Sequence, residues 1–221
     1  SKINLDQKKL DQQSQHWEAS FLSKPEMFGL EPSLAAVKAL KSFKEQNIKN
    51  IIELGAGLGR DTIFFAKNSI KVEALDYSKM SIESITDKSI KLNLTNFIKP
   101  KVFDVRKKLP FEKNSIDACF SHMLYCMALS NSDLVNLNNE ICRILKPGGI
   151  NIYTVRHTGD GDYKNGIHRG DDLYENDGFI VHFFSKEKVN QLSKGFEVLE
   201  IEEFEEGKFP RKLFIVKNRK L

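Results

Sequence analysis

We expect an α/β domain whose mostly parallel sheet carries helices on both faces, and three features of the 221-residue sequence favour it. Strand and helix patterns alternate from residue 49 to residue 156, which is typical of βαβ units. A hydrophobic content of 40% and a charged content of 29% are those of a globular domain. The last two strand patterns, 196–204 and 210–216, follow each other so closely that they should pair antiparallel.

Residues 1–30 are expected to form a helical extension that acts as a lid. Within it, 4–20 have the pattern of a polar helix, and the prolines and glycine of 24–33 indicate a loop. A helix should then start at Ser33. Its apolar face would comprise Leu34, Val37, Leu40 and Phe43.

The central elements follow in a regular order. Strands are expected at 49–54, 70–75, within 97–105, 115–120 and 150–156. Helices are expected at 59–67, 78–92 and 132–146. Ser132 fits the N-cap of the last helix, and the KPGG turn at 146–149 should end it.

After residue 156 the alternation stops. The stretch 157–178 is polar and glycine-rich, and it is followed by "FIVHFF" and a short helix at 185–193. The chain contains no repeat, low-complexity tract or linker composition. We therefore expect one domain over 1–221, with 157–184 as an insert beside the site.

Charge and cysteine usage exclude several classes of function. The net charge of +4 is too small to favour nucleic acid as a partner. No stretch approaches the ~20 apolar residues that cross a bilayer, and no apolar run resembles a secretion signal, so we expect a cytoplasmic protein without membrane contact. Cys119, Cys126 and Cys142 form no CxxC, which argues against a disulfide framework or a metal site.

Three glycines stand where the first strand of the alternation ends, in "IIELGAGLGR" (51–60). Glycine allows positive φ and lets the backbone approach a ligand, so the spacing predicts a small molecule against the main chain. A dinucleotide site would show G-x-G-x-x-G, whereas this loop reads G-x-G-x-G. Asp76 ends the second strand, 21 residues after Gly55, where a carboxylate can hold ribose hydroxyls.

At this point the sequence resembles a known family. The motifs "ELGAGLGRDT" (53–62), "LDYS" (75–78), "FDV" (103–105) and "LKPGG" (145–149) are similar, in order and spacing, to those of class I S-adenosylmethionine-dependent methyltransferases. Within that family the chain resembles the small-molecule enzymes of the tellurite-resistance-like branch. The resemblance implies a Rossmann-like seven-stranded sheet, with the C-terminal antiparallel strands as its sixth and seventh.

The resemblance also implies a set of cofactor contacts. Gly55, Ala56 and Gly57 would approach the amino-acid part of S-adenosylmethionine, and Glu53 would help to hold its ammonium group. Asp76 would accept hydrogen bonds from both ribose hydroxyls.

The remaining implied contacts lie around the adenine and the methyl group. Tyr77 would lie against the adenine, Asp104 would accept from its amino group, and the Val105 backbone would meet the ring edge. Ser121 and His122 would leave the fourth strand beside the methyl donor. Trp17, in the N-terminal extension, would offer an aromatic face to the sulfonium or the adenine.

Catalysis of methyl transfer chiefly needs alignment of nucleophile, methyl and sulfur, and it requires no metal. A general base helps when the acceptor is protonated. The candidates follow the fourth and fifth strands: His122, Tyr125, Arg156 and His157. His168 and His182 are further histidines, although a lone histidine is more often structural. Arg60 and Asp61 are expected to form a local ion pair.

The acceptor is expected to be a small molecule, because no recognition module or strongly basic face is visible. An RNA or protein methyltransferase, or a non-catalytic cofactor-binding subunit, remains the alternative. A nucleobase amino-methyltransferase is disfavoured, because "SHML" (121–124) replaces its Pro-Pro-aromatic run. The glycine spacing argues against a nicotinamide-dependent oxidoreductase. The acceptor's identity and the oligomeric state are not predicted.

Overall fold

The computed structural model describes residues 3–25 and 27–221, and its centre is the expected seven-stranded sheet. The strand order is β3-β2-β1-β4-β5-β10-β9, with β10 antiparallel to both of its neighbours. The strands are β1 (Asn50–Leu54), β2 (Lys71–Asp76), β3 (Ile98–Val102), β4 (Ile116–His122), β5 (Leu145–Arg156), β9 (Phe196–Glu206) and β10 (Arg211–Lys220). The prediction of a Rossmann-like sheet with an antiparallel C-terminal pair is confirmed.

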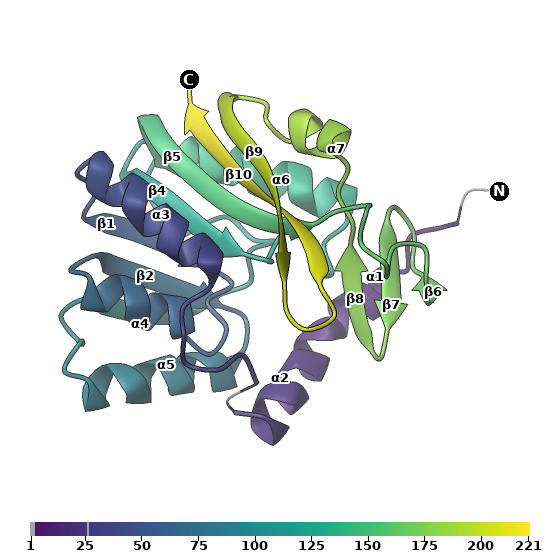
Figure 1. Ribbon diagram of the computed structural model, residues 1–221, viewed down its shortest axis with the longest axis horizontal. Coiled ribbons are helices and arrows are strands. Elements are labelled where there is room, and N and C mark those ends of the chain that lie inside the picture. The colour runs from purple at the N-terminus through teal and green to yellow at the C-terminus, as the bar shows by residue number, and fades with distance from the viewer. Residues whose placement is uncertain (1–2, 26) are drawn as a thin grey trace.

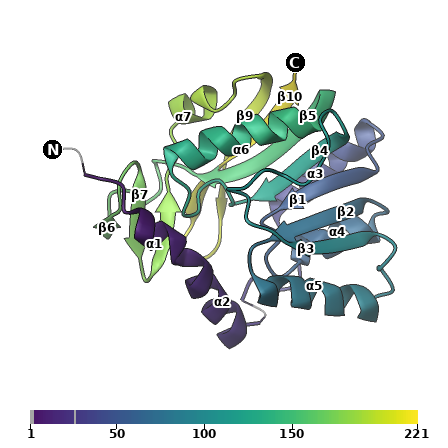
Figure 2. The same ribbon diagram turned by 180° about the vertical axis from the view of Figure 1, so that it is seen from behind.

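Helices cover both faces of this sheet, because alternate strand residues bury their side chains on opposite sides. One core holds Ile51 of β1 against the helices α3, α4 and α5, and the other holds Ile52 against α6 and α7. Figure 1 shows α3 and α4 before the sheet, and Figure 2 shows α6 from the other side. These helices are α3 (Leu34–Glu45), α4 (Arg60–Lys67), α5 (Lys79–Lys91), α6 (Asn131–Ile144) and α7 (Lys186–Gln191).

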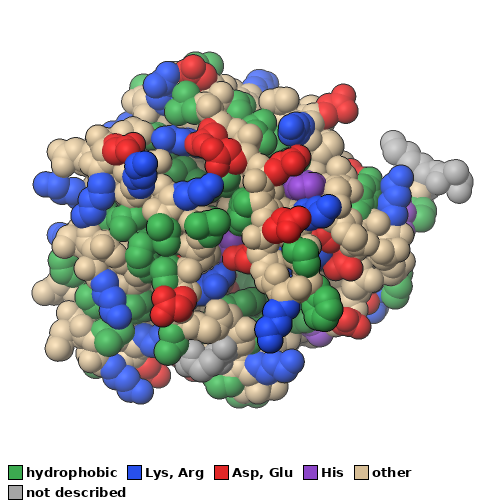
Figure 3. All heavy atoms as spheres, in the orientation of Figure 1, with side chains coloured by type: hydrophobic (Ala, Val, Ile, Leu, Met, Phe, Trp, Pro, Cys, Tyr) green, Lys and Arg blue, Asp and Glu red, His purple; other side chains and the backbone are tan. Residues whose placement is uncertain are grey.

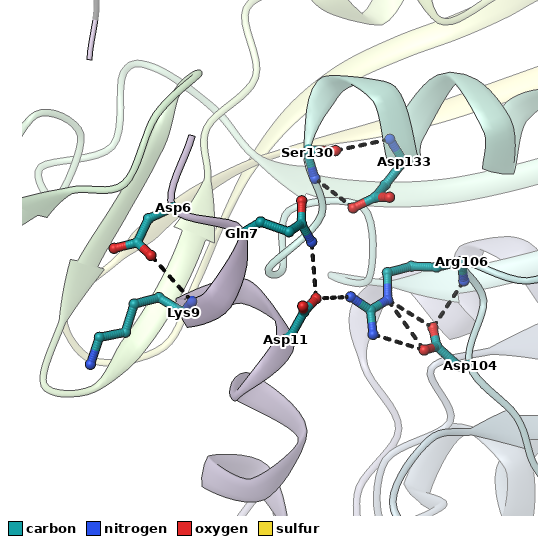
Figure 4. Close-up of polar contacts among 8 residues, drawn as sticks. All are labelled: Asp6, Gln7, Lys9, Asp11, Asp104, Arg106, Ser130 and Asp133. Atoms are coloured by element: carbon teal, nitrogen blue, oxygen red, sulfur yellow. Dashed lines mark hydrogen bonds and ion pairs between the residues drawn. The ribbon is translucent and has the colours of Figure 1, made fainter. Parts of the chain in front are cut away.

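The ends of α6 differ from the expectation at both termini. Ser130, not Ser132, is the N-cap, because Ser130 and Asp133 exchange the two hydrogen bonds of a capping box (Figure 4). The KPGG segment at 146–149 is not a separate turn, since β5 already begins at Leu145.

The N-terminal extension forms two helices rather than the single expected one: α1 (Gln7–Asp11) and α2 (Gln13–Ser23). The Gln13 side chain is buried. Its Nε2 donates to the Gly178 carbonyl, and its Oε1 accepts from the Ile180 N–H. This anchors the start of α2 on the segment that precedes α7, and both views show α1 and α2 beside that segment (Figures 1 and 2).

That segment is a small antiparallel sheet that the sequence did not reveal. It comprises β6 (Ile167–His168), β7 (Leu173–Asn176) and β8 (Phe179–His182) in the order β6-β7-β8. Leu10 of α1 packs with Leu173 and Ile180 in a separate small core. An ion pair of 3.0 Å joins Asp6 to Arg169. The extension and the insert therefore form one surface beside the large sheet.

The exterior shows no concentration of one charge on the face drawn in Figure 3, where basic and acidic side chains are interspersed. Over the described ranges, no helix is both long enough and apolar enough to span a membrane.

Candidate active site

A cavity of about 560 Å³ lies at the carboxyl ends of β1, β2 and β4, where open parallel sheets bind ligands. Its floor includes the glycine loop that follows β1, and its roof includes Trp17 and Phe21 of α2 together with Phe28. The three roof rings pack on one another, with centroids 5.4–6.4 Å apart. Residues far apart in the chain thus enclose one space.

The glycines of the loop meet different requirements. Gly57 has φ +58°, and no heavy atom lies within 4 Å of the point that a Cβ would occupy, so its backbone faces open space in the cavity. Gly59 has φ +89° and caps α4, and a Cβ there would lie 2.7 Å from Cγ1 of the buried Ile85. Gly57 therefore leaves room for a ligand, whereas Gly59 leaves room for α5.

Asp76 closes the loop from the end of β2. Its Oδ2 accepts from the Gly57 N–H and its Oδ1 from the Ser78 N–H, each at 2.9 Å. Burial raises the pKa of Asp76 to about 6, although both backbone bonds act in the opposite direction. A carboxylate held rigidly in this way keeps its remaining lone pairs for two further donors.

Glu53 is a second buried carboxyl, 3% exposed, beneath the same loop. Thr62 of α4 donates its hydroxyl to Glu53 Oε1 at 2.5 Å. Burial raises the pKa of Glu53 well above its usual value, and the neighbouring Asp61 adds to the rise. A ligand cation in the cavity would supply the positive charge that this carboxyl lacks.

Asp104 lies at the cavity wall beyond β3, but its carboxylate already has a partner. Arg106 donates to Asp104 from Nε and from Nη2, the latter at 2.9 Å, and reaches Asp11 of α1 at 2.6 Å (Figure 4). Burial opposes ionisation of Asp104, yet the Arg106 contacts prevail and its pKa is lowered. We name Asp11, Arg106 and Asp104 the clasp, because they tie α1 to the large sheet.

Tyr77 and Val105, which follow Asp76 and Asp104 in the sequence, also line the cavity. Burial raises the pKa of the Tyr77 hydroxyl, so its ring is neutral and available for stacking.

His122 also lines the cavity, and both of its ring nitrogens have polar contacts. Nδ1 lies 2.7 Å from Thr154 Oγ1, and Nε2 lies 3.2 Å from each carboxylate oxygen of Glu206. Thr154 in turn accepts from the N–H of Met123, whose φ is +58°. The positive φ marks a strained turn directly after β4.

Glu206 was not foreseen from the sequence. It ends β9, 84 positions from His122, and no local pattern links the two residues. Arg60 Nη2 lies 3.6 Å from Glu206, so Arg60 does not form the expected pair with Asp61. Asp61 instead accepts two hydrogen bonds from Ser33, at 2.7 and 2.8 Å.

Two candidates from the fourth strand lie in the core instead of the cavity. Tyr125 is 2% exposed, stacks on Tyr153 and accepts from Asn151 at 3.0 Å. Burial raises the pKa of its hydroxyl further above the ordinary value, which is unfavourable for a base. Ser121 is 1% exposed and does not reach the cavity lining.

The two candidates at the end of the fifth strand, Arg156 and His157, lie in different places. Arg156 lines the cavity and is held by Asp160 and Asp162, with Nη2 at 2.8 Å from each. His157 points away: it stacks on Phe214 and accepts from the Gly159 N–H at 2.9 Å. Alternation along β5 explains the difference, because neighbouring residues face opposite sides.

His168 and His182, the two further histidines named from the sequence, lie outside the cavity lining. His168 bonds the Asp171 carbonyl at 2.8 Å. His182 is fully buried and bonds the Leu129 carbonyl at 2.7 Å, and burial lowers its pKa to about 4.

Of the implied cofactor residues, the structure brings ten to one cavity: Trp17, Glu53, Gly55, Ala56, Gly57, Asp76, Tyr77, Asp104, Val105 and His122. Of the catalytic set, His122 and Arg156 line it. The residues of the glycine loop and of the motifs after β2 and β3 thus converge on one place in the fold.

Comparison with known proteins identifies the same segment. A family model described as a methyltransferase domain matches residues 51–149. Phosphoethanolamine N-methyltransferase 1 of Triticum aestivum is 34% identical over 129 residues, which cover 57% of this chain and 22% of that protein. The chain therefore spans about a fifth of the length of this relative.

Solved structures agree on the fold. The 1,6-didemethyltoxoflavin-N1-methyltransferase of Burkholderia thailandensis, solved with 1,6-didemethyltoxoflavin and S-adenosylhomocysteine, aligns over 100% of this chain and 92% of its own, with a TM-score of 0.78 and 15% identity. TehB from Haemophilus influenzae aligns over 93% of this chain and 67% of its own, with a TM-score of 0.67 and 18% identity. Residues 51–149 thus match a methyltransferase-domain model, and the fold of the chain is that of the S-adenosylmethionine-dependent methyltransferases.

Proposed function

We propose that this chain binds S-adenosylmethionine in the cavity and transfers its methyl group to a small-molecule acceptor by in-line displacement. The observation that carries the proposal is Asp76. Its two oxygens are fixed by the N–H groups of Gly57 and Ser78 at the glycine loop, inside the cavity. This arrangement suits a ribose, whose two hydroxyls can each donate to one carboxylate oxygen.

The rest of the cavity accommodates the other parts of the cofactor. The open space at Gly57 admits the amino-acid part against the backbone, and Glu53 would accept from its ammonium group. Tyr77 and Val105 would contact the adenine. Asp104 would accept from the adenine amino group while it keeps its bonds to Arg106.

The protein's part in the chemistry is alignment and exclusion of water. When bound, the cofactor supplies a methyl group on a sulfonium, which is already activated. The roof formed by Trp17, Phe21 and Phe28 would cover it. His122 would border the methyl group with its ring held by Glu206 and Thr154, and Arg156 would border the acceptor.

A small acceptor is supported by the enclosed cavity and by the relative, whose name gives phosphoethanolamine as its substrate. We also propose that the chain belongs to the tellurite-resistance-like branch and is located in the cytoplasm. Residues 1–30 would act as a lid, and residues 157–184 would form an insert on the acceptor side. Residues 1–2 and 26 of the lid lie outside the described residues.

The test is a calorimetric titration with S-adenosylmethionine, followed by measurement of S-adenosylhomocysteine production with a panel of small acceptors. Asp76→Ala should weaken binding about 100-fold, since charge-assisted hydrogen bonds contribute about 1.5–3 kcal/mol each. Asp117→Ala is the matched control, because Asp117 is an exposed carboxylate paired with Lys146 and is absent from the lining. Equal affinity in both variants would refute the proposed site. Binding without turnover of any acceptor would favour a non-catalytic subunit.

A further inference from the structure

Two arginines of the cavity lining, Arg60 and Arg211, lie near the carboxylate of Glu206, which contacts His122. Glu206 faces both His122 and Arg60. Arg211 is the direct cross-strand neighbour of Glu206 in the β9–β10 hairpin. Directly opposed residues project from the same face of a sheet, so the Arg211 guanidinium enters the same region as the Glu206 carboxylate.

Arg211 lines the cavity, yet its guanidinium forms no hydrogen bond or ion pair with any residue in the ranges 3–25 and 27–221. Burial raises the pKa of Glu206 and its contact with His122 lowers it, and the nearby charge of Arg211 adds a little to the lowering. Arg211 is exposed to solvent at the cavity wall, and its planar fork matches the oxygens of a carboxylate or a phosphate.

The other arginines of the lining are already occupied. Arg156 is bound by two aspartates, and Arg106 belongs to the clasp. Arg60 shares Glu206 with His122 and donates to the Phe28 carbonyl at 3.3 Å. Glu206 is thus paired with Arg60 and His122, whereas Arg211 has no carboxylate partner among the described residues. The Arg211 guanidinium lies across the hairpin from Glu206, which contacts His122, where the acceptor would meet the methyl group.

We propose that the acceptor is an oxyanion-bearing small molecule, and that Arg211, with Arg60 beside it, binds its phosphate or carboxylate group. The inference rests on the proposed methyltransferase function and specifies the acceptor. The anion would give the Arg211 guanidinium the partner that the described residues do not supply. Its fixed position would direct the nucleophile at the other end of the molecule toward the methyl group.

The experiment measures acceptor binding separately from cofactor binding. The protein is first saturated with S-adenosylhomocysteine, and that affinity is recorded. It is then titrated by calorimetry with phosphoethanolamine and with β-alanine, which carry a phosphate and a carboxylate. Ethanolamine is the probe without an anion. The variants are Arg211→Gln, Arg211→Lys and Lys212→Gln.

Lys212 is the matched control because it follows Arg211 in β10, is exposed and does not line the cavity. We expect an anionic probe to bind the wild type, ethanolamine not to bind, and Arg211→Gln to weaken the probe about 10- to 100-fold. Arg211→Lys should restore part of the affinity, since it keeps the charge but loses the fork. Lys212→Gln and the cofactor affinity should be unchanged. The better anionic probe identifies the oxyanion.

Two results would overturn the inference while leaving the cofactor site intact. The first is that neither anionic probe binds to wild-type protein that does bind S-adenosylhomocysteine. The second is that Arg211→Gln binds the probes as tightly as the wild type. Failure to bind S-adenosylhomocysteine would instead overturn the proposed function itself.

Discussion

Affinity for the cofactor should depend on pH through Asp76. In the ligand-free protein, burial raises the pKa of this carboxyl from 3.8 to about 6. Ribose hydroxyls donate to the carboxylate, so the ligand selects the deprotonated form. Below pH 6 the affinity should therefore fall about tenfold for each pH unit, and above pH 6 the contribution of Asp76 should be constant.

The same shift affects the ligand-free fold with a definite sign. A raised pKa means that the folded state holds the proton more tightly than the unfolded chain. The contribution of Asp76 to stability is thus fully present below pH 3.8 and is lost as pH rises to about 6. The loss is on the order of 3 kcal/mol, from about two pKa units at 1.36 kcal/mol each. A bound ligand that hydrogen-bonds to the carboxylate would offset it.

The assay is calorimetric titration with S-adenosylhomocysteine between pH 5 and 7, on wild type, Asp76→Asn and Glu53→Gln. Asp76→Asn should remove the Asp76 part of the slope and weaken binding about 100-fold at pH 7. Glu53→Gln shows how much of the pH dependence comes from the second buried carboxyl, Glu53, whose pKa is also raised. A wild-type affinity that is flat over this range, or a slope unchanged in Asp76→Asn, would refute the reasoning.

Three further predictions use other parts of the site. Gly59→Ala should lower the unfolding free energy by about 1–3 kcal/mol, because the added Cβ would lie 2.7 Å from Ile85. Gly57→Ala should cost only about 1 kcal/mol of backbone strain, but it should impair cofactor binding. Thermal melts measure the first effect and calorimetric titrations the second. Arg106→Ala breaks the clasp and should speed tryptic cleavage within α1, with S-adenosylhomocysteine protecting less than in wild type; unchanged cleavage would contradict this role. Burial alone would raise the pKa of Glu206, but the contacts of its carboxylate with His122 and Arg60 lower that pKa below its ordinary value. Ionised Glu206 therefore stabilises the fold above pH 4.5, and this stabilisation is lost on acidification. Glu206→Gln should then melt below wild type at pH 7 and approach it near pH 4, and a constant gap would contradict the linkage.

Local signals explain what the sequence could reveal. The alternation of strand and helix patterns over 49–156 indicated the parallel sheet, because buried side chains recur with different spacings in strands and in helices. The loop at Gly57 and the carboxylate at Asp76 are separated by a predictable βαβ distance, and they meet in the structure at 2.9 Å.

Long-range contacts explain what it could not reveal. Glu206 reaches His122 across the hairpin, and the clasp joins α1 to a loop more than ninety positions away. Tyr125 was expected in the cleft because it follows β4, but the strained turn at Met123 redirects the chain and its ring enters the core. The small sheet β6–β8 escaped notice because its strands have only two to four residues, and part of its packing comes from α1 and α2.

The central claim is that the cavity holds the adenosyl part of S-adenosylmethionine on Asp76. A crystal structure with S-adenosylhomocysteine tests it most directly. We expect both ribose hydroxyls about 2.7 Å from the Asp76 oxygens, the adenine beside Tyr77 and the sulfur directed toward His122. An adenosyl group bound elsewhere, or one whose ribose makes no contact with Asp76, would contradict the account.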